Sequence, residues 1–137
     1  MMRPFKVFLV LLLMVMGVEL RAETTLEVKK KWGIPYISGG LNKGEAQFMD
    51  KIAPRFPVQL TFKNQGKEES IAGVQVRVFD MRGDLIFEEI ATGPKMFLTI
   101  DNGRYTFKAT YMSRELAFTK DLTGRRYLVL GFDFSVR

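Results

Sequence analysis

The sequence predicts a mainly β protein, in which an antiparallel sandwich of about seven strands is preceded by one short helix. Two observations lead to this prediction. Polar and apolar residues alternate strictly from Arg104 to Tyr111, which is the period of a strand with one buried face. Similar alternating runs, separated by turn residues, recur from Val58 to the C-terminus at the spacing typical of a sandwich.

The turn before Arg104 adds a more specific signal. The residues Asp101, Gly103 and Tyr105 have the spacing of a tyrosine corner, in which a tyrosine near the start of a strand donates a hydrogen bond to the backbone just upstream. This feature is typical of immunoglobulin-like sandwiches. The predicted strands cover residues 58–62, 74–78, 85–91, 96–100, 104–111, 115–122 and 127–136. The predicted core includes Val76, Val78, Leu98, Tyr105, Phe107, Leu130 and Phe132.

The short helix is expected between Asn42 and Pro54. Asn42 is a favourable N-cap, and Glu45 three residues later completes a capping-box pattern. Apolar residues then follow at helical spacing. Pro54 ends the pattern because its ring clashes with the preceding turn and it has no N–H to donate.

The N-terminus has the pattern of a secretory signal peptide. Arg3 and Lys6 precede an uncharged, largely apolar run, and Ala22 provides a small residue at a cleavage site. The alternative is an uncleaved anchor, for which the run is shorter than the roughly 20 residues that span a bilayer. We therefore expect a signal peptide at 1–22, an N-terminal arm and helix at 23–56, and the sandwich at 57–137, in a periplasmic or secreted protein.

Composition excludes several kinds of chemistry. The chain has no cysteine and no histidine, so disulfides, thiol nucleophiles, imidazole bases and ordinary zinc sites are excluded. The net charge is +6, and removal of residues 1–22 leaves 18 basic and 14 acidic side chains, or about +4. We expect no enzyme activity and no cofactor. We also expect no nucleic-acid partner, because the basic residues are dispersed and an exported protein is in the wrong compartment.

Part of the chain resembles a known family. The run from Gly73 to Asp80, the turn at Gly83 and the run from Asn102 to Tyr111 are similar to the carboxypeptidase regulatory-like domains, which have a prealbumin-like β-sandwich. Residues 36–40, the helix around Glu45 and residues 56–62 resemble small exported bacterial proteins that carry this domain and have no characterised role. The resemblance implies a non-catalytic accessory fold and assigns no catalytic residue.

The arm contains the candidate binding residues. Lys30 and Lys31 adjoin Trp32 and Tyr36, a combination that suits a phosphate-rich surface or a sugar ring. The alternative is a solvated strand edge whose lysines prevent aggregation. The second set is Gly39, Gly40 and Lys43, whose backbone amides and positive charge suit an anion before the helix, or which simply form a tight turn.

Acidic residues also occur at a predicted turn. Asp80 and Asp84 flank Gly83 and are calcium ligands by type, but ordinary turn chemistry explains them equally well. We expect no metal site. The function that we expect is an exported module that binds another cell-envelope protein. The alternative is a carbohydrate or cell-wall binding domain that uses Trp32 and Tyr36.

Overall fold

The computed structural model describes residues 26–64 and 71–134. The predicted signal peptide lies outside the described residues, as do the end of the last predicted strand and most of the loop after Lys63. In chain order, the elements are β1 (Lys29–Lys31), β2 (Ile34–Gly39), α2 (Lys43–Ile52), the 3-10 helix η1 (Ala53–Arg55), β3 (Val58–Lys63), β4 (Gln75–Phe79), β5 (Leu85–Ile90), β6 (Lys95–Leu98), β7 (Arg104–Tyr111), β8 (Arg114–Asp121) and β9 (Leu128–Asp133).

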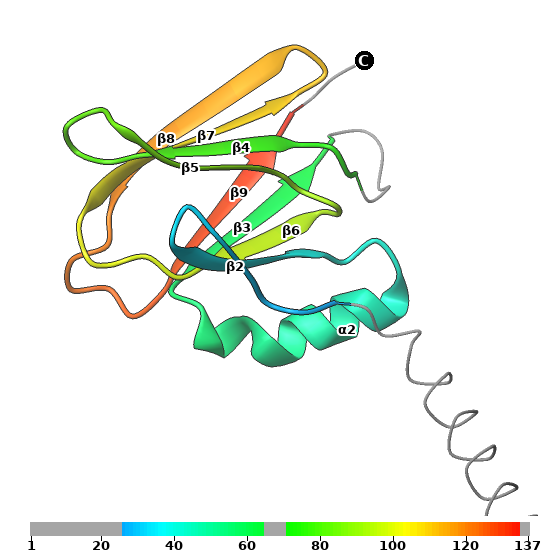
Figure 1. Cartoon of the computed structure of the whole chain (residues 1–137). Helices are drawn as coiled ribbons and strands as arrows, with labels where there is room; N and C mark the ends of the chain where they lie inside the picture. Colours follow the sequence, from blue (N-terminus) through cyan, green and yellow to red (C-terminus); the bar gives the residue numbers. More distant parts are fainter. Residues whose placement is uncertain (1–25, 65–70, 135–137) are drawn as a thin grey trace, which may run out of the picture.

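The strands form two sheets that face each other (Figure 1). The five-stranded sheet has the order β1-β2-β6-β3-β9, and the four-stranded sheet has the order β5-β4-β7-β8. Neighbouring strands are antiparallel except β3 and β9, which pair in parallel from Val58↔Leu128 to Lys63↔Asp133. The mainly β sandwich is therefore confirmed. Residues 26–64 and 71–134 contain one short α-helix, and the seven strands that follow it there match the number predicted.

The arm before the helix takes part in the sandwich. β1 and β2 form a hairpin, and β2 also pairs with β6 from Tyr36↔Leu98 to Gly39↔Lys95. Tyr36 and Ile37 are buried, on opposite faces of the sheet. In the sequence, the helix therefore comes between β2 and β3, two strands of the same sheet, and not before all of the strands.

The helix forms for the predicted reasons. The Asn42 side chain accepts a hydrogen bond from the Glu45 N–H at 2.8 Å, as an N-cap does. Met49 and Ile52 turn inward and pack on the outer face of the five-stranded sheet, below which α2 runs in Figure 1. There they form a second apolar cluster with Ile37 and Phe97. Pro54 falls in η1, directly after the α-helix.

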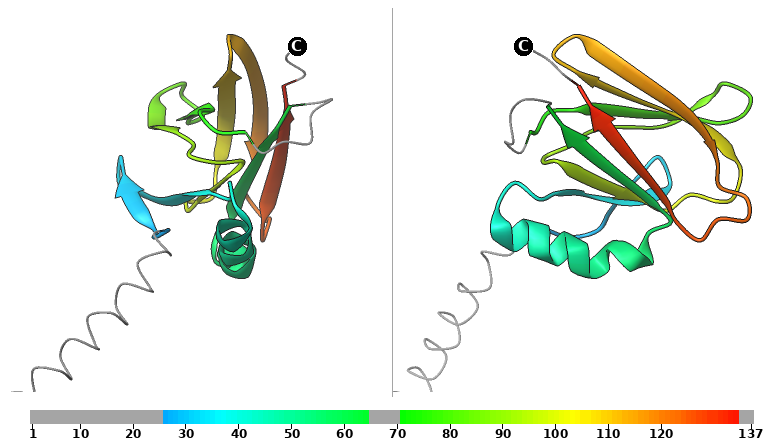
Figure 2. Two further views of the ribbon diagram at one scale, coloured as in Figure 1. Left: turned by 90° about the vertical axis from the view of Figure 1, so that its right-hand side faces the viewer. Right: turned by 180° about the vertical axis from the view of Figure 1, so that it is seen from behind.

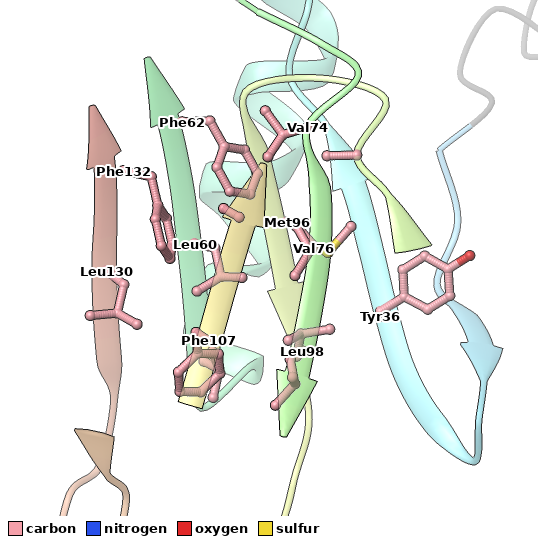
Figure 3. Close-up of a cluster of buried hydrophobic side chains, with 14 of the residues drawn as sticks. Tyr36, Leu60, Phe62, Val74, Val76, Met96, Leu98, Phe107, Leu130 and Phe132 are labelled. Atoms are coloured by element: carbon pink, nitrogen blue, oxygen red, sulfur yellow. The ribbon is translucent and has the colours of Figure 1, made fainter. Parts of the chain in front are cut away.

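The main core fills the space between the sheets (Figure 3). Alternate residues of each strand point inward, which is why the alternation in the sequence identified them. All the predicted core residues except Tyr105 are buried, and Tyr105 packs half-buried against the core. The Tyr105 hydroxyl donates to the Asp101 carbonyl at 2.8 Å, which confirms the tyrosine corner.

Candidate functional site

The β1–β2 hairpin turns through Trp32 and Gly33. Both have left-handed backbone conformations, with φ of +58° and +78°. Two-residue hairpin turns of this kind favour Asn-Gly, since a residue with a Cβ costs roughly 1–2 kcal/mol in the left-handed region. The Trp32 side chain is 52% exposed and belongs to neither of the two hydrophobic clusters of the described residues. Backbone preference and core packing both leave Trp32 unexplained.

Behind the turn, three side chains link the two sheets. The Tyr36 hydroxyl donates to Glu89 Oε2 at 2.6 Å, and Lys31 Nζ lies 3.2 Å from Glu89 Oε1. The Ile90 N–H also donates to Glu89 Oε1, at 3.0 Å. We call Lys31, Tyr36 and Glu89 the inter-sheet network. It joins the inner face of the hairpin to the edge strand β5.

The network changes the acidity of two of its members. Burial, then the hydrogen bond to Glu89 and its negative charge, raises the pKa of Tyr36 to about 12. Burial by itself favours the neutral acid of Glu89, but hydrogen bonds from Tyr36, Ile90 and Lys31 outweigh it and lower the pKa of Glu89. The carboxylate and the neutral phenol are therefore the favoured forms at neutral pH.

A pocket of about 380 Å³ opens beside this network. β1 pairs with β2 only as far as Tyr36, so within the described residues Ile37–Gly39 have no strand on that side. The hairpin therefore separates at its open end, and Leu26 closes the gap by packing on Gly39, where a Cβ would lie only 2.9 Å from Leu26 Cδ2. The walls of the pocket include Leu26, Lys29, Ser38, Glu89, Ile90 and Thr92.

Ser38 and Thr92 connect the two sides of this pocket. Their hydroxyls are 3.0 Å apart, the Thr92 N–H donates to Ser38 Oγ at 3.2 Å, and the Thr92 hydroxyl donates to the Ser38 carbonyl at 3.1 Å. Ile90 lies next to them and is 57% exposed. The pocket thus combines exposed apolar surface with hydroxyl and carboxylate groups, which is a composition suited to binding.

The second predicted set lies at the start of the helix. The Gly40 and Leu41 N–H groups donate to Glu45 Oε1 at 3.1 and 3.2 Å. Lys43 is the first helical residue and is exposed. Because a carboxylate of the chain itself already occupies these amides, an external anion would have to displace Glu45. The geometry at Gly39 and Gly40 is that of a tight turn beside a capped helix.

The structure brings together only part of the predicted site. Lys31 and Tyr36 meet at Glu89, whereas Trp32 lies at the turn and Lys30 points to the other face of β1. Glu89 was missed as a site residue, although the alternation from Phe87 to Glu89 places a carboxylate on the inner face of a strand. A carboxylate on the inner face of a strand needs a hydrogen-bond or ion-pair partner.

Asp80, which the sequence offered as a possible calcium ligand, instead stabilises the β4–β5 turn. Asp80 Oδ1 accepts the N–H groups of Arg82 and Asp84, both at 2.9 Å. Gly83 has a φ of +90° and donates to the Asp80 carbonyl. Asp80 therefore serves the turn. In residues 26–64 and 71–134, no three acidic side chains gather in a way that suits a metal ion.

Comparison with known protein families, with curated proteins and with solved structures finds no match to this chain. Neither α2 nor η1, the helices in the described part of the chain, has the length and apolar content of a membrane-crossing helix.

Proposed function

We propose that the protein is a non-catalytic binding module of the bacterial cell envelope, and that it contacts another envelope protein at the pocket between β2 and the end of β5. The observation that carries this proposal is the edge of β2 at Ile37–Gly39 on the side away from β6, beside which residues 26–64 and 71–134 place no strand and which adjoins the pocket and the exposed Ile90. Open strand edges with a neighbouring pocket recognise protein segments through backbone hydrogen bonds and side-chain insertion.

The proposed location and family rest on the sequence. The apolar N-terminal run supports export, and the residues from Gly73 to Tyr111 support a carboxypeptidase regulatory-like domain. The two-sheet sandwich is compatible with such a domain, and the tyrosine corner is a feature of the related immunoglobulin-like sandwiches. In this proposal the sandwich is a rigid support, and the hairpin and pocket provide the contact surface.

A point substitution tests the contact surface. Ile90→Lys places a charge at the pocket, and Val129→Lys is its control, because Val129 is 62% exposed on β9 at the far edge of the five-stranded sheet. The tagged variants are used to recover partners from envelope extract. We expect Ile90→Lys to lower recovery of the main partner at least tenfold and Val129→Lys to leave it unchanged. Equal recovery by both would remove the pocket from the proposal.

Carbohydrate binding is the second candidate, and exposed Trp32 favours it. Tyr36 does not present a ring to a sugar, because it packs edge-on against Phe87 at 5.3 Å and its hydroxyl is bonded to Glu89. Figure 3 shows its hydroxyl turned away from the core at the margin of the cluster. If a sugar ring stacks on Trp32 alone, cell-wall glycan fragments should quench Trp32 fluorescence. Unchanged fluorescence at millimolar glycan would contradict it.

A further inference from the structure

The turn of the β1–β2 hairpin projects from the body of the protein. In the left-hand view of Figure 2, the blue strand β1 forms the outer edge of the five-stranded sheet, to the left of the other strands of that sheet. Trp32 lies at this turn, half exposed in a left-handed conformation, and Val28 at the other end of β1 is 52% exposed. The feature is therefore a convex tip with an aromatic ring, and the pocket lies further along the hairpin.

The strand that leads into the tip is basic on both faces. Lys29, Lys30 and Lys31 are all exposed, and their partners across the hairpin place Lys29 and Lys31 on one face and Lys30 on the other. Lys31 pairs with Glu89. In the described ranges, no carboxylate lies within ion-pair distance of Lys29 or Lys30. Lys30 thus carries the ammonium group nearest Trp32 that no described carboxylate pairs with, whereas Lys29 lines the pocket further along the hairpin.

We propose that this tip docks on an anionic lipid surface. The indole ring is amphipathic and is favoured at the headgroup level of a bilayer. Lysines beside it place their ammonium groups among lipid phosphates while their stems cover apolar surface. A projecting tip suits a surface that yields around it, whereas a rigid protein or a glycan needs a matching cavity or hydrogen-bonding groups around the ring. This docking goes beyond the proposed protein contact and does not depend on it.

The strength of docking follows from the number of free charges. Each lysine near an anionic membrane contributes roughly fivefold to binding. Glu27 is exposed three positions before Lys30 and opposes the attraction, while Lys31 already neutralises Glu89. We therefore expect the protein to bind anionic vesicles weakly, at millimolar concentrations of lipid, and to dissociate as the salt concentration rises.

Trp32 is the only tryptophan of the chain, so its fluorescence reports the tip directly. The whole exported protein is titrated with vesicles of phosphatidylcholine alone and of phosphatidylcholine with phosphatidylglycerol in equal parts. We expect a blue shift and protection from acrylamide only with the anionic vesicles, reversed by high salt. Residues 1–22, where present, are common to every variant, so the differences between variants report the hairpin.

Three variants complete the test. Lys30→Gln should weaken anionic vesicle binding roughly fivefold. Trp32→Asn removes the indole ring and should weaken co-sedimentation with these vesicles at least as much. Asparagine suits the left-handed turn, so this variant keeps the fold. Lys51→Gln is the matched control, because it removes one exposed charge from α2. Unchanged Trp32 emission at millimolar anionic lipid, or equal losses in Lys30→Gln and Lys51→Gln, overturns the proposal. A response to cell-wall glycan but not to vesicles also overturns it and assigns the tip to carbohydrate.

Discussion

Phe107 is fully buried on the inner face of β7, directly opposite Phe118 of β8. Phe107→Ala should cost about 3–5 kcal/mol of unfolding free energy, because it removes a large side chain and leaves a cavity. Phe118→Ala is the matched control. Its ring is 37% exposed, so the same truncation should cost clearly less. Urea denaturation of both variants measures the difference, and equal losses would contradict the assigned core.

Tyr36 gives the protein a dependence on alkaline pH. Its pKa of about 12 in the folded protein lies above its ordinary value near 10, so the neutral phenol favours folding. This contribution is complete below pH 10 and is lost as pH rises toward 12. The stability difference between the native chain and Tyr36→Phe should thus be constant from pH 7 to about 10 and shift against the native chain above it. Denaturation at a series of pH values checks this, and a flat difference up to pH 12 would contradict the raised pKa that burial and the bond to Glu89 give Tyr36.

At the scale of residues, local chemistry was predictable and distant partners were not. Tyr105 was identified because its acceptor Asp101 lies in the same turn, and Asn42 because its partner Glu45 is three residues away. The Tyr36–Glu89 bond joins residues 53 positions apart in different sheets. Only the tertiary structure places them together, so the sequence suggested Tyr36 as a binding residue when its hydroxyl is a structural donor.

Two hairpin turns contain non-glycine residues in the left-handed conformation, which is unfavourable for a residue with a Cβ. The β7–β8 hairpin turns through Met112 and Ser113, with φ of +47° and +70°, much as β1–β2 turns through Trp32 and Gly33. Met112→Asn with Ser113→Gly restores the residues favoured in such a turn. We expect this double variant to gain about 1 kcal/mol in stability. A thermal melt measures the gain, and a lower melting temperature would show that Met112 makes contacts that outweigh the strain.

At the scale of elements, strands and helix were predictable because their periods differ. A half-buried strand alternates every second residue and a surface helix every three to four, and this chain keeps to one period within α2, β3, β4 and β9. The β1–β2 hairpin was harder to predict. Its turn lacks the usual Asn-Gly signal, and Lys29–Lys31 show no apolar alternation.

The arrangement of the strands shows the limit of sequence at the scale of the molecule. β9 pairs in parallel with β3, across more than sixty intervening residues, and β2 is placed beside β6 rather than beside β3. Such pairings depend on which edges meet after the layers pack, and no local pattern encodes them. They also decide whether residues before the helix belong to the folded unit.

The last prediction concerns that unit. A fragment of residues 57–137 matches the sandwich expected from sequence, but it lacks β2 and α2. Without them, β6 loses its strand partner on one side, and Phe97 loses its cover from Ile37 and Met49. We expect this fragment to show no cooperative thermal transition by circular dichroism, whereas a chain from residue 23 with Trp32→Asn unfolds cooperatively. A cooperative transition in the fragment would show that the seven later strands fold alone and that the hairpin and helix are accessories to them.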